Sequence, residues 1–129
     1  MALKIELKPY ERFIIGNSVV ITDRRVCLTI LGNLPVLREK DILRAEQAVT
    51  PATRIYFAVQ SLVLENNLAS EQDEILKETR LLLARHPSAA SVVASMTAHI
   101  AAGEHYKALK DAKRLRELEE HHTEALGAA

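Results

Sequence analysis

The chain has 129 residues, of which 48% are apolar, so we expect one domain or two very small ones with a packed core rather than disorder. Seventeen basic residues balance seventeen acidic ones, whereas binding to a polyanion usually goes with a basic excess. No apolar run approaches the roughly 18 residues of a membrane span, so no membrane partner is expected. The lysine-containing N-terminus does not resemble a signal peptide, and the single Cys27 permits no internal disulfide, so we expect a cytoplasmic protein.

The first 40 residues predict short antiparallel β-strands. The stretch 3–8, LKIELK, alternates apolar and charged residues, and short β-branched runs follow at 12–15, 19–22, 26–31 and 36–38. Turn signals separate them: Gly16-Asn17, the polar stretch 23–25, and Gly32-Asn33 with Pro35. The result is a β-meander of four or five strands. It is too small to be stable alone and must pack on helices or on a second copy in a homodimer.

From about residue 41 the apolar spacing changes to that of helices. We expect about four: one from the Thr50 cap and Pro51 to Asn66-Asn67, one from a Ser70 cap to just before Pro87, one from a Ser88 cap to Gly103, and one over 104–126. The fold class is therefore α+β, with a small β subdomain at 1–44 and a helical subdomain at 45–129 packed on it as a single folding unit. The apolar stripe of the fourth helix is narrow, so much of that helix should be exposed or bind a partner.

The sequence contains no motif of an enzyme. Phosphate-binding glycine loops, HExxH and CxxC are all absent, so neither catalysis nor a cofactor is expected. Cys27, within an apolar strand, is predicted to be a buried and inert thiol. Glu117 and His121 have a spacing that can hold a metal ion, but an exposed acidic helix explains them more simply, and no metal site is predicted.

Six cations in the strand region are candidates for binding RNA phosphates. Lys4 and Lys8 lie on the polar face of the first strand, Arg24 and Arg25 at a turn, and Arg38 and Lys40 after the last strand. On neighbouring strands they could form one basic edge, although small sheets also carry lysine merely to protect an edge from pairing. Aromatic residues are scarce: only Tyr10 and Phe13 lie in this region, and Phe13 is expected in the core, so a platform that stacks several bases is not expected.

Several closely spaced stretches resemble FlbT, the flagellum biosynthesis repressor family of alphaproteobacteria. They are LREKDI (37–42), EQA (46–48), Thr50-Pro51 and RIYFAVQ (54–60). The resemblance implies a cytoplasmic post-transcriptional regulator that binds the 5′ leader of flagellin mRNA and reduces its translation or stability. It also implies a gene neighbourhood shared with the flagellin-associated protein FlaF.

Residues 3–42 more faintly resemble CsrA, a small dimeric β protein that binds mRNA leaders. Arg38, followed by Glu39 and Ile42, matches the R-E-x-x-I context in which an arginine of that family contacts RNA. The resemblance therefore implies an RNA contact by Arg38 from the last strand. The first strand departs from the family pattern, because Lys8 follows Leu7 rather than a second basic residue.

An alternative is a module that binds a flagellar protein and affects mRNA only indirectly. In that case the fourth helix would dock FlaF or flagellin through its apolar stripe. The partner-binding residues would be Tyr106, Leu109, Leu115 and Leu118.

Overall fold

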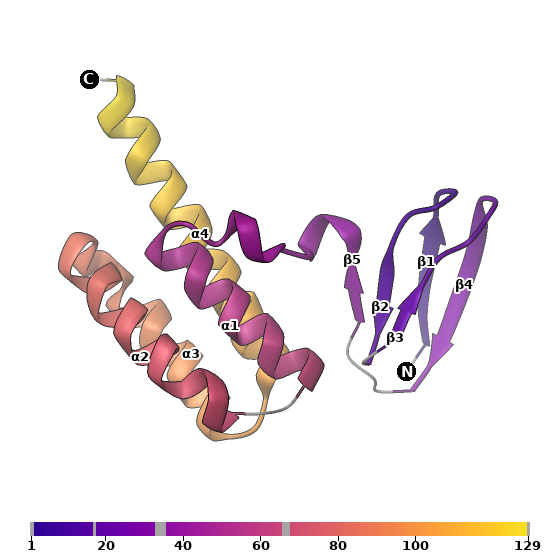
Figure 1. The fold of residues 1–129 in the computed structure, drawn as a ribbon, viewed down its shortest axis with the longest axis horizontal. Coiled ribbons are helices and arrows are strands. Elements are labelled where there is room, and N and C mark those ends of the chain that lie inside the picture. The colour runs from indigo at the N-terminus through magenta and orange to yellow at the C-terminus, as the bar shows by residue number, and fades with distance from the viewer. Residues whose placement is uncertain (1, 17, 33–35, 66–67, 129) are drawn as a thin grey trace. The chain divides into compact units, whose positions relative to one another are not determined.

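The computed structural model describes residues 2–16, 18–32, 36–65 and 68–128. The chain divides into two compact units, Met1–Ile42 and Leu43–Ala129 (Figure 1). The first holds the strands and the second the helices, so the predicted α+β class is confirmed. The expectation that the helical part packs on the sheet as one folding unit stays a prediction. No described helix is both long and apolar enough to cross a membrane.

The N-terminal unit contains two antiparallel sheets rather than one meander. Its strands are β1 (Ala2–Leu7), β2 (Phe13–Ile15), β3 (Ser18–Val20), β4 (Val26–Leu31) and β5 (Val36–Arg38). One sheet pairs β1 with β4 and the other has the order β3-β2-β5. Among the described strands, β2 and β3 are the only chain neighbours that pair, through the expected two-residue hairpin, in which Gly16 has φ 60°. Asn17 of that turn lies outside the described residues, as do Asn33 and Pro35 of the later one.

The core of this unit explains why the pairing is not sequential. Ile5, Leu7 and Phe13 are buried together, and apolar side chains from β2, β3, β4 and β5 pack around them. Strands of three residues bury little surface in a single layer, so the chain folds back and the two sheets share one core. Alternation places Cys27 on the other side of β4, where it is exposed. The prediction of a buried thiol is therefore wrong.

The described part of the helical unit holds the four α-helices α1 (Pro51–Glu65), α2 (Leu68–Arg85), α3 (Ala90–Ala101) and α4 (His105–Ala128). Short 3₁₀ turns cover Glu39–Asp41, Ala45–Gln47 and Pro87–Ala89. Helix α1 lies against both α2 and α4, and α3 packs on α4 (Figure 1). The buried side chains of α1 include Ile55, Tyr56, Val59 and Leu62, which agrees with the prediction that this helix is central.

The predicted start of α1 is correct, and two other predicted helix starts are not. The Thr53 amide donates to Thr50 Oγ1 at 3.3 Å, and Pro51 occupies the first helical position, as a capping threonine followed by proline predicts. Helix α2 begins at Leu68, so Ser70 is inside its first turn rather than at its cap. Ser88 lies in the 3₁₀ turn before α3. The predicted end of the first helix at Asn66-Asn67 lies outside the described residues.

Candidate nucleic-acid interface

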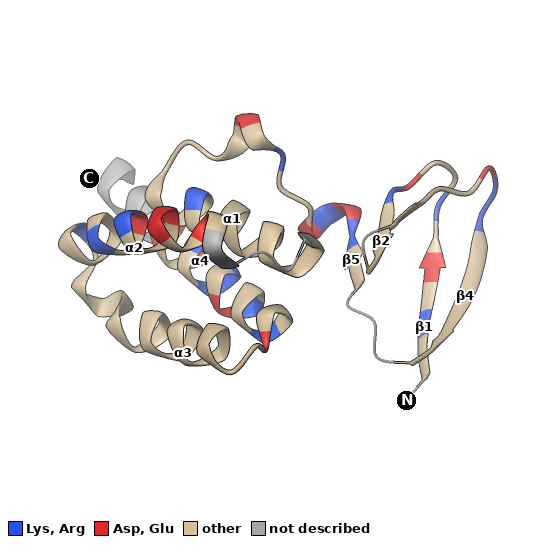
Figure 2. Cartoon of the chain, turned by 60° about the horizontal axis from the view of Figure 1, so that its bottom comes forward, with Lys and Arg blue, Asp and Glu red and all other residues tan. Residues whose placement is uncertain are grey.

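Five of the six candidate cations lie at one end of the N-terminal unit. Leu7 pairs with Val26 at the end of the β1–β4 ladder, so Lys8 and Arg25, the next residues beyond that pair, lie at the same end. Arg38, the last residue of β5, pairs with Phe13, the first residue of β2. Residues 8–12 connect the end of β1 to this start of β2, so Arg38 lies at the same end of the unit. We call Lys8, Arg24, Arg25, Arg38 and Lys40 the cationic end. In Figure 2, blue segments lie where β1 ends and β4 begins.

Lys4 does not belong to this group. It lies in the middle of β1, opposite Thr29 of β4, and its side chain is exposed. It lies three positions before Leu7 along the strand, at roughly 3.4 Å per residue. The six candidates therefore do not form a single patch, and any contact by Lys4 would be to a different part of an extended ligand.

The three arginines of the cationic end are paired with carboxylates. Arg24 Nε lies 3.2 Å from Asp23 Oδ1, and Arg25 Nε lies 3.3 Å from Glu6 Oε1. Arg38 Nη2 lies 3.4 Å from Glu11 Oε2 and donates to the Glu6 carbonyl oxygen at 2.9 Å. Among the described residues, Lys8 and Lys40 make no ion pair, so their ammonium groups are the ones most available to an anion.

Residues 8–11 form a strained turn at this end. The Glu11 amide donates to the Lys8 carbonyl oxygen at 3.1 Å, and the Tyr10 amide donates to the Thr22 carbonyl oxygen at 2.7 Å. Pro9 occupies the second position of the turn, and Tyr10 occupies the third with φ 61°. That is the geometry of a type II turn, in which glycine or asparagine usually takes the third position. A larger residue there costs roughly 1–2 kcal/mol, and Tyr10 is nevertheless 71% exposed.

An open hollow of about 550 Å³ lies between this turn and the end of β5. Lys8, Pro9, Tyr10 and Glu11 line one side, and residues 38–40 line the other. The lining carries three cations against two carboxylates, so it holds a small positive excess. Its volume is within the range of small-molecule sites.

The Glu11 carboxylate fixes the turn. Its Oε1 accepts the Lys8 amide at 3.0 Å, and the Arg38 guanidinium lies on its other oxygen. The bond from the Lys8 amide is the largest influence on Glu11 and, with a contribution from the Arg38 guanidinium, holds the pKa of Glu11 below its usual value of 4.5, although partial desolvation opposes the shift. Glu11 therefore stays ionised and keeps Arg38 in place.

Sequence reasoning missed two residues at this end. Arg12 directly precedes β2, is exposed and makes no ion pair among the described residues. Its place in the sequence, in the connection between two predicted strands, was the only indication that it could belong to the cationic end. The exposed, strained Tyr10 had a weaker signal, since proline at the second turn position favours type II but tyrosine at the third does not. The predicted burial of Phe13 is confirmed, with no exposed surface.

The apolar stripe of α4, predicted to dock a partner, lies largely inside the helical unit. Leu109 is 3% exposed and Leu115 is fully buried, because α1 and α3 both pack on this helix. Leu118 is half-buried, and Tyr106, 37% exposed, is the one member of the four at the surface. Lys110 Nζ lies 5.2 Å from the centre of the Tyr106 ring. Two of the four residues therefore cannot contact a partner in this fold.

The chain is similar to proteins of one family along nearly its whole length. Residues 3–123 match the family described as flagellar protein FlbT. A probable flagellum biosynthesis repressor protein FlbT of Rhodopseudomonas palustris is 43% identical over 121 residues, covering 93% of this chain and 96% of the relative. The flagellum biosynthesis repressor protein FlbT of Caulobacter vibrioides is 38% identical over 125 residues, covering 93% and 88%. No solved structure matches the chain, and the resemblance of residues 3–42 to CsrA stays a prediction.

Proposed function

The chain belongs to the FlbT family of flagellar proteins, and from that premise we propose that it represses flagellin synthesis by binding the 5′ leader of flagellin mRNA. Binding would reduce translation of the message or its stability. The contacts would be made by the cationic end of the N-terminal unit. The repressor part of the proposal is supported by the names of relatives 43% and 38% identical to this chain.

The observation that carries the RNA part is the gathering of five cations from three separate stretches of chain at one end of a small unit. The pairing of β1 with β4 and of β2 with β5 brings them together. Lys8 and Lys40 face the same hollow and are the primary phosphate contacts in this proposal. Arg24, Arg25 and Arg38 already have carboxylate partners, so they would contribute by sharing their donors with RNA phosphates.

The alternative, indirect action through FlaF or flagellin docked on α4, has less support. Its predicted contact residues Leu109 and Leu115 are in the helical core. It predicts that the purified chain does not distinguish flagellin leader RNA from an unrelated RNA. The same titration therefore separates the two mechanisms.

A titration of the purified full-length chain with fluorescently labelled flagellin leader RNA, and with a scrambled RNA of equal length, tests the proposal. We expect tighter binding to the leader. Lys8→Gln combined with Lys40→Gln should weaken leader binding about tenfold, because two phosphate contacts are lost. A matched variant, Lys77→Gln with Arg80→Gln, removes two exposed charges from α2 and should bind like wild type. Equal binding by wild type and the Lys8/Lys40 variant would remove the cationic end from the mechanism.

A further inference from the structure

We propose that Tyr10 stacks on an unpaired base and that the hollow beside it holds the adjoining nucleotide, so that the ligand is single-stranded rather than duplex RNA. This inference rests on the proposed RNA-binding function and adds to it the class of RNA that is recognised. Two independent features carry it: the strained backbone and exposed ring of Tyr10, and the two lysines of the same hollow, which make no ion pair in the described part of the chain.

The placement of Tyr10 opposes its conformational preference. Its positive φ suits glycine or asparagine, and the ring covers no core, since 71% of the residue is exposed. Its backbone is held by the bond to the Thr22 carbonyl oxygen and by the turn that Glu11 closes. Stability of the fold alone does not require a tyrosine here. Strained residues kept in an exposed turn are a reason to look for a binding role.

The surroundings of the ring match what a single nucleotide offers. A phosphate is an anion that Lys8 and Lys40 can contact from the two sides of the hollow. A base presents a flat π-face that stacks on an aromatic ring whatever its sequence. Because Phe13 is buried, Tyr10 provides the stacking surface at this end, so one base rather than a row of bases is held.

Duplex RNA cannot use this arrangement. Its bases are stacked on one another within the helix, and proteins reach mainly its backbone and shallow minor groove. An exposed ring on a turn would therefore gain little from a duplex, whereas an unpaired loop base can stack on it. The cationic end would still attract the phosphates of either form.

The test compares two substitutions of Tyr10 that distinguish stacking by the aromatic ring from the backbone conformation of the turn. Tyr10→Phe keeps a ring that can stack. Tyr10→Asn removes the ring and suits the positive φ of the turn, so the fold should be at least as stable as wild type in thermal unfolding. Each full-length variant is titrated with a fluorescently labelled single-stranded fragment of the flagellin leader, and with the same fragment annealed to its complement.

We expect Tyr10→Phe to bind the single strand like wild type and Tyr10→Asn to bind it about tenfold more weakly, with duplex binding equal in all three proteins. If Tyr10→Asn binds the single strand as tightly as wild type while the Lys8/Lys40 variant is weakened, stacking is wrong and the proposed function stands. If wild type binds neither form above a scrambled control, the proposed function and this inference both fail.

Discussion

Arg38 has a structural role that competes with the contact expected of it. It bonds the Glu6 carbonyl of β1 and pairs with Glu11 of the turn, so one guanidinium, extending from the end of β5, ties together the two sheets. Removing it would disturb the hollow as well as remove a positive charge. Lys8 and Lys40 make no such contacts among the described residues, and substitutions there report on anion binding more directly.

The Glu11 carboxylate gives this end a predictable response to acid. Its pKa is lowered in the folded chain, first by the Lys8 amide and then by Arg38. Ionised Glu11 therefore stabilises the folded unit above its unfolded pKa, and this contribution is lost as the pH falls through the folded pKa. We expect NMR titration to place the pKa of Glu11 below 4.5. In Glu11→Gln, the loss of stability relative to wild type should shrink as the solution is acidified. A Glu11 pKa above that value would contradict the assigned bonds.

Individual strands and turns follow closely from local sequence. The alternation in β1 and the β-branched run of β4 determine those strands, and β5 covers the predicted residues 36–38. Helix α2 shows the limit: serine is compatible with both a cap and a first helical turn, so Ser70 does not mark the start. Helix α4 shows a second limit of prediction from local sequence. Its narrow apolar stripe does not indicate that α1 and α3 both pack on this helix, where Leu109 and Leu115 are buried.

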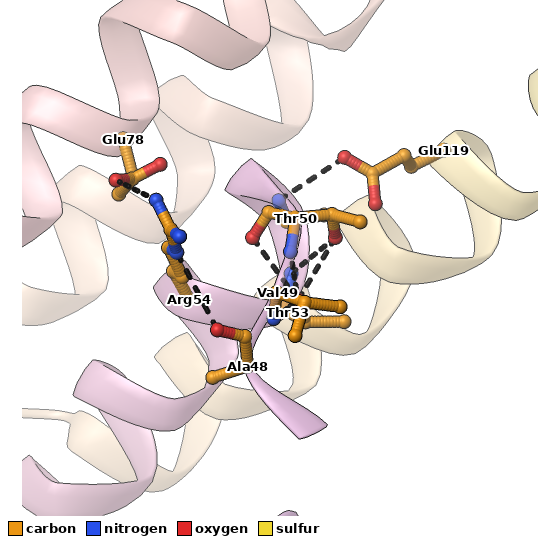
Figure 3. A network of polar contacts seen from close by, with 8 residues as sticks. Ala48, Val49, Thr50, Thr53, Arg54, Glu78 and Glu119 are labelled. Atoms are coloured by element: carbon orange, nitrogen blue, oxygen red, sulfur yellow. Dashed lines mark hydrogen bonds and ion pairs between the residues drawn. The ribbon is translucent and has the colours of Figure 1, made fainter. Parts of the chain in front are cut away.

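The start of α1 depends on a residue distant in sequence. Glu119 of α4 accepts the Ala52 amide at 3.2 Å through Oε2 (Figure 3). Thr50 and Thr53 bond each other's backbone at the same point. The bond satisfies an amide that the helix itself cannot, and a carboxylate is favoured at a helix N-terminus.

Replacing Glu119 should therefore destabilise the helical unit. We expect Glu119→Ala to lower the free energy of unfolding by about 1–2 kcal/mol in urea denaturation, the range for loss of a cap. Alanine favours helix, so α4 itself should not be weakened. Glu120→Ala removes the exposed neighbouring carboxylate and should change stability by less than about 0.5 kcal/mol. Equal effects of the two substitutions would mean that Glu119 does not cap α1.

Strand pairing brings the residues of the candidate site together, and the pairing is the feature of the fold that the sequence predicts least well. A meander would place each strand beside its chain neighbour, whereas β1 pairs with β4 and β2 with β5. The predicted basic edge therefore becomes an end at which residues 8, 24–25 and 38–40 meet, while Lys4 stays apart. The ion pairs of Arg25 and Arg38 with Glu6 and Glu11 also depend on that pairing, and spacing along the chain could not predict them.

Binding of RNA through the cationic end is tested most directly by measuring the affinity of the purified chain for flagellin leader RNA over a range of salt concentrations. If Lys8 and Lys40 each neutralise a phosphate, wild-type affinity falls with salt. The logarithmic slope of the Lys8→Gln/Lys40→Gln variant should then be shallower by about 1.4, at roughly 0.7 per contact on a single strand. Identical slopes for the two proteins, or an affinity insensitive to salt, would contradict binding through the cationic end.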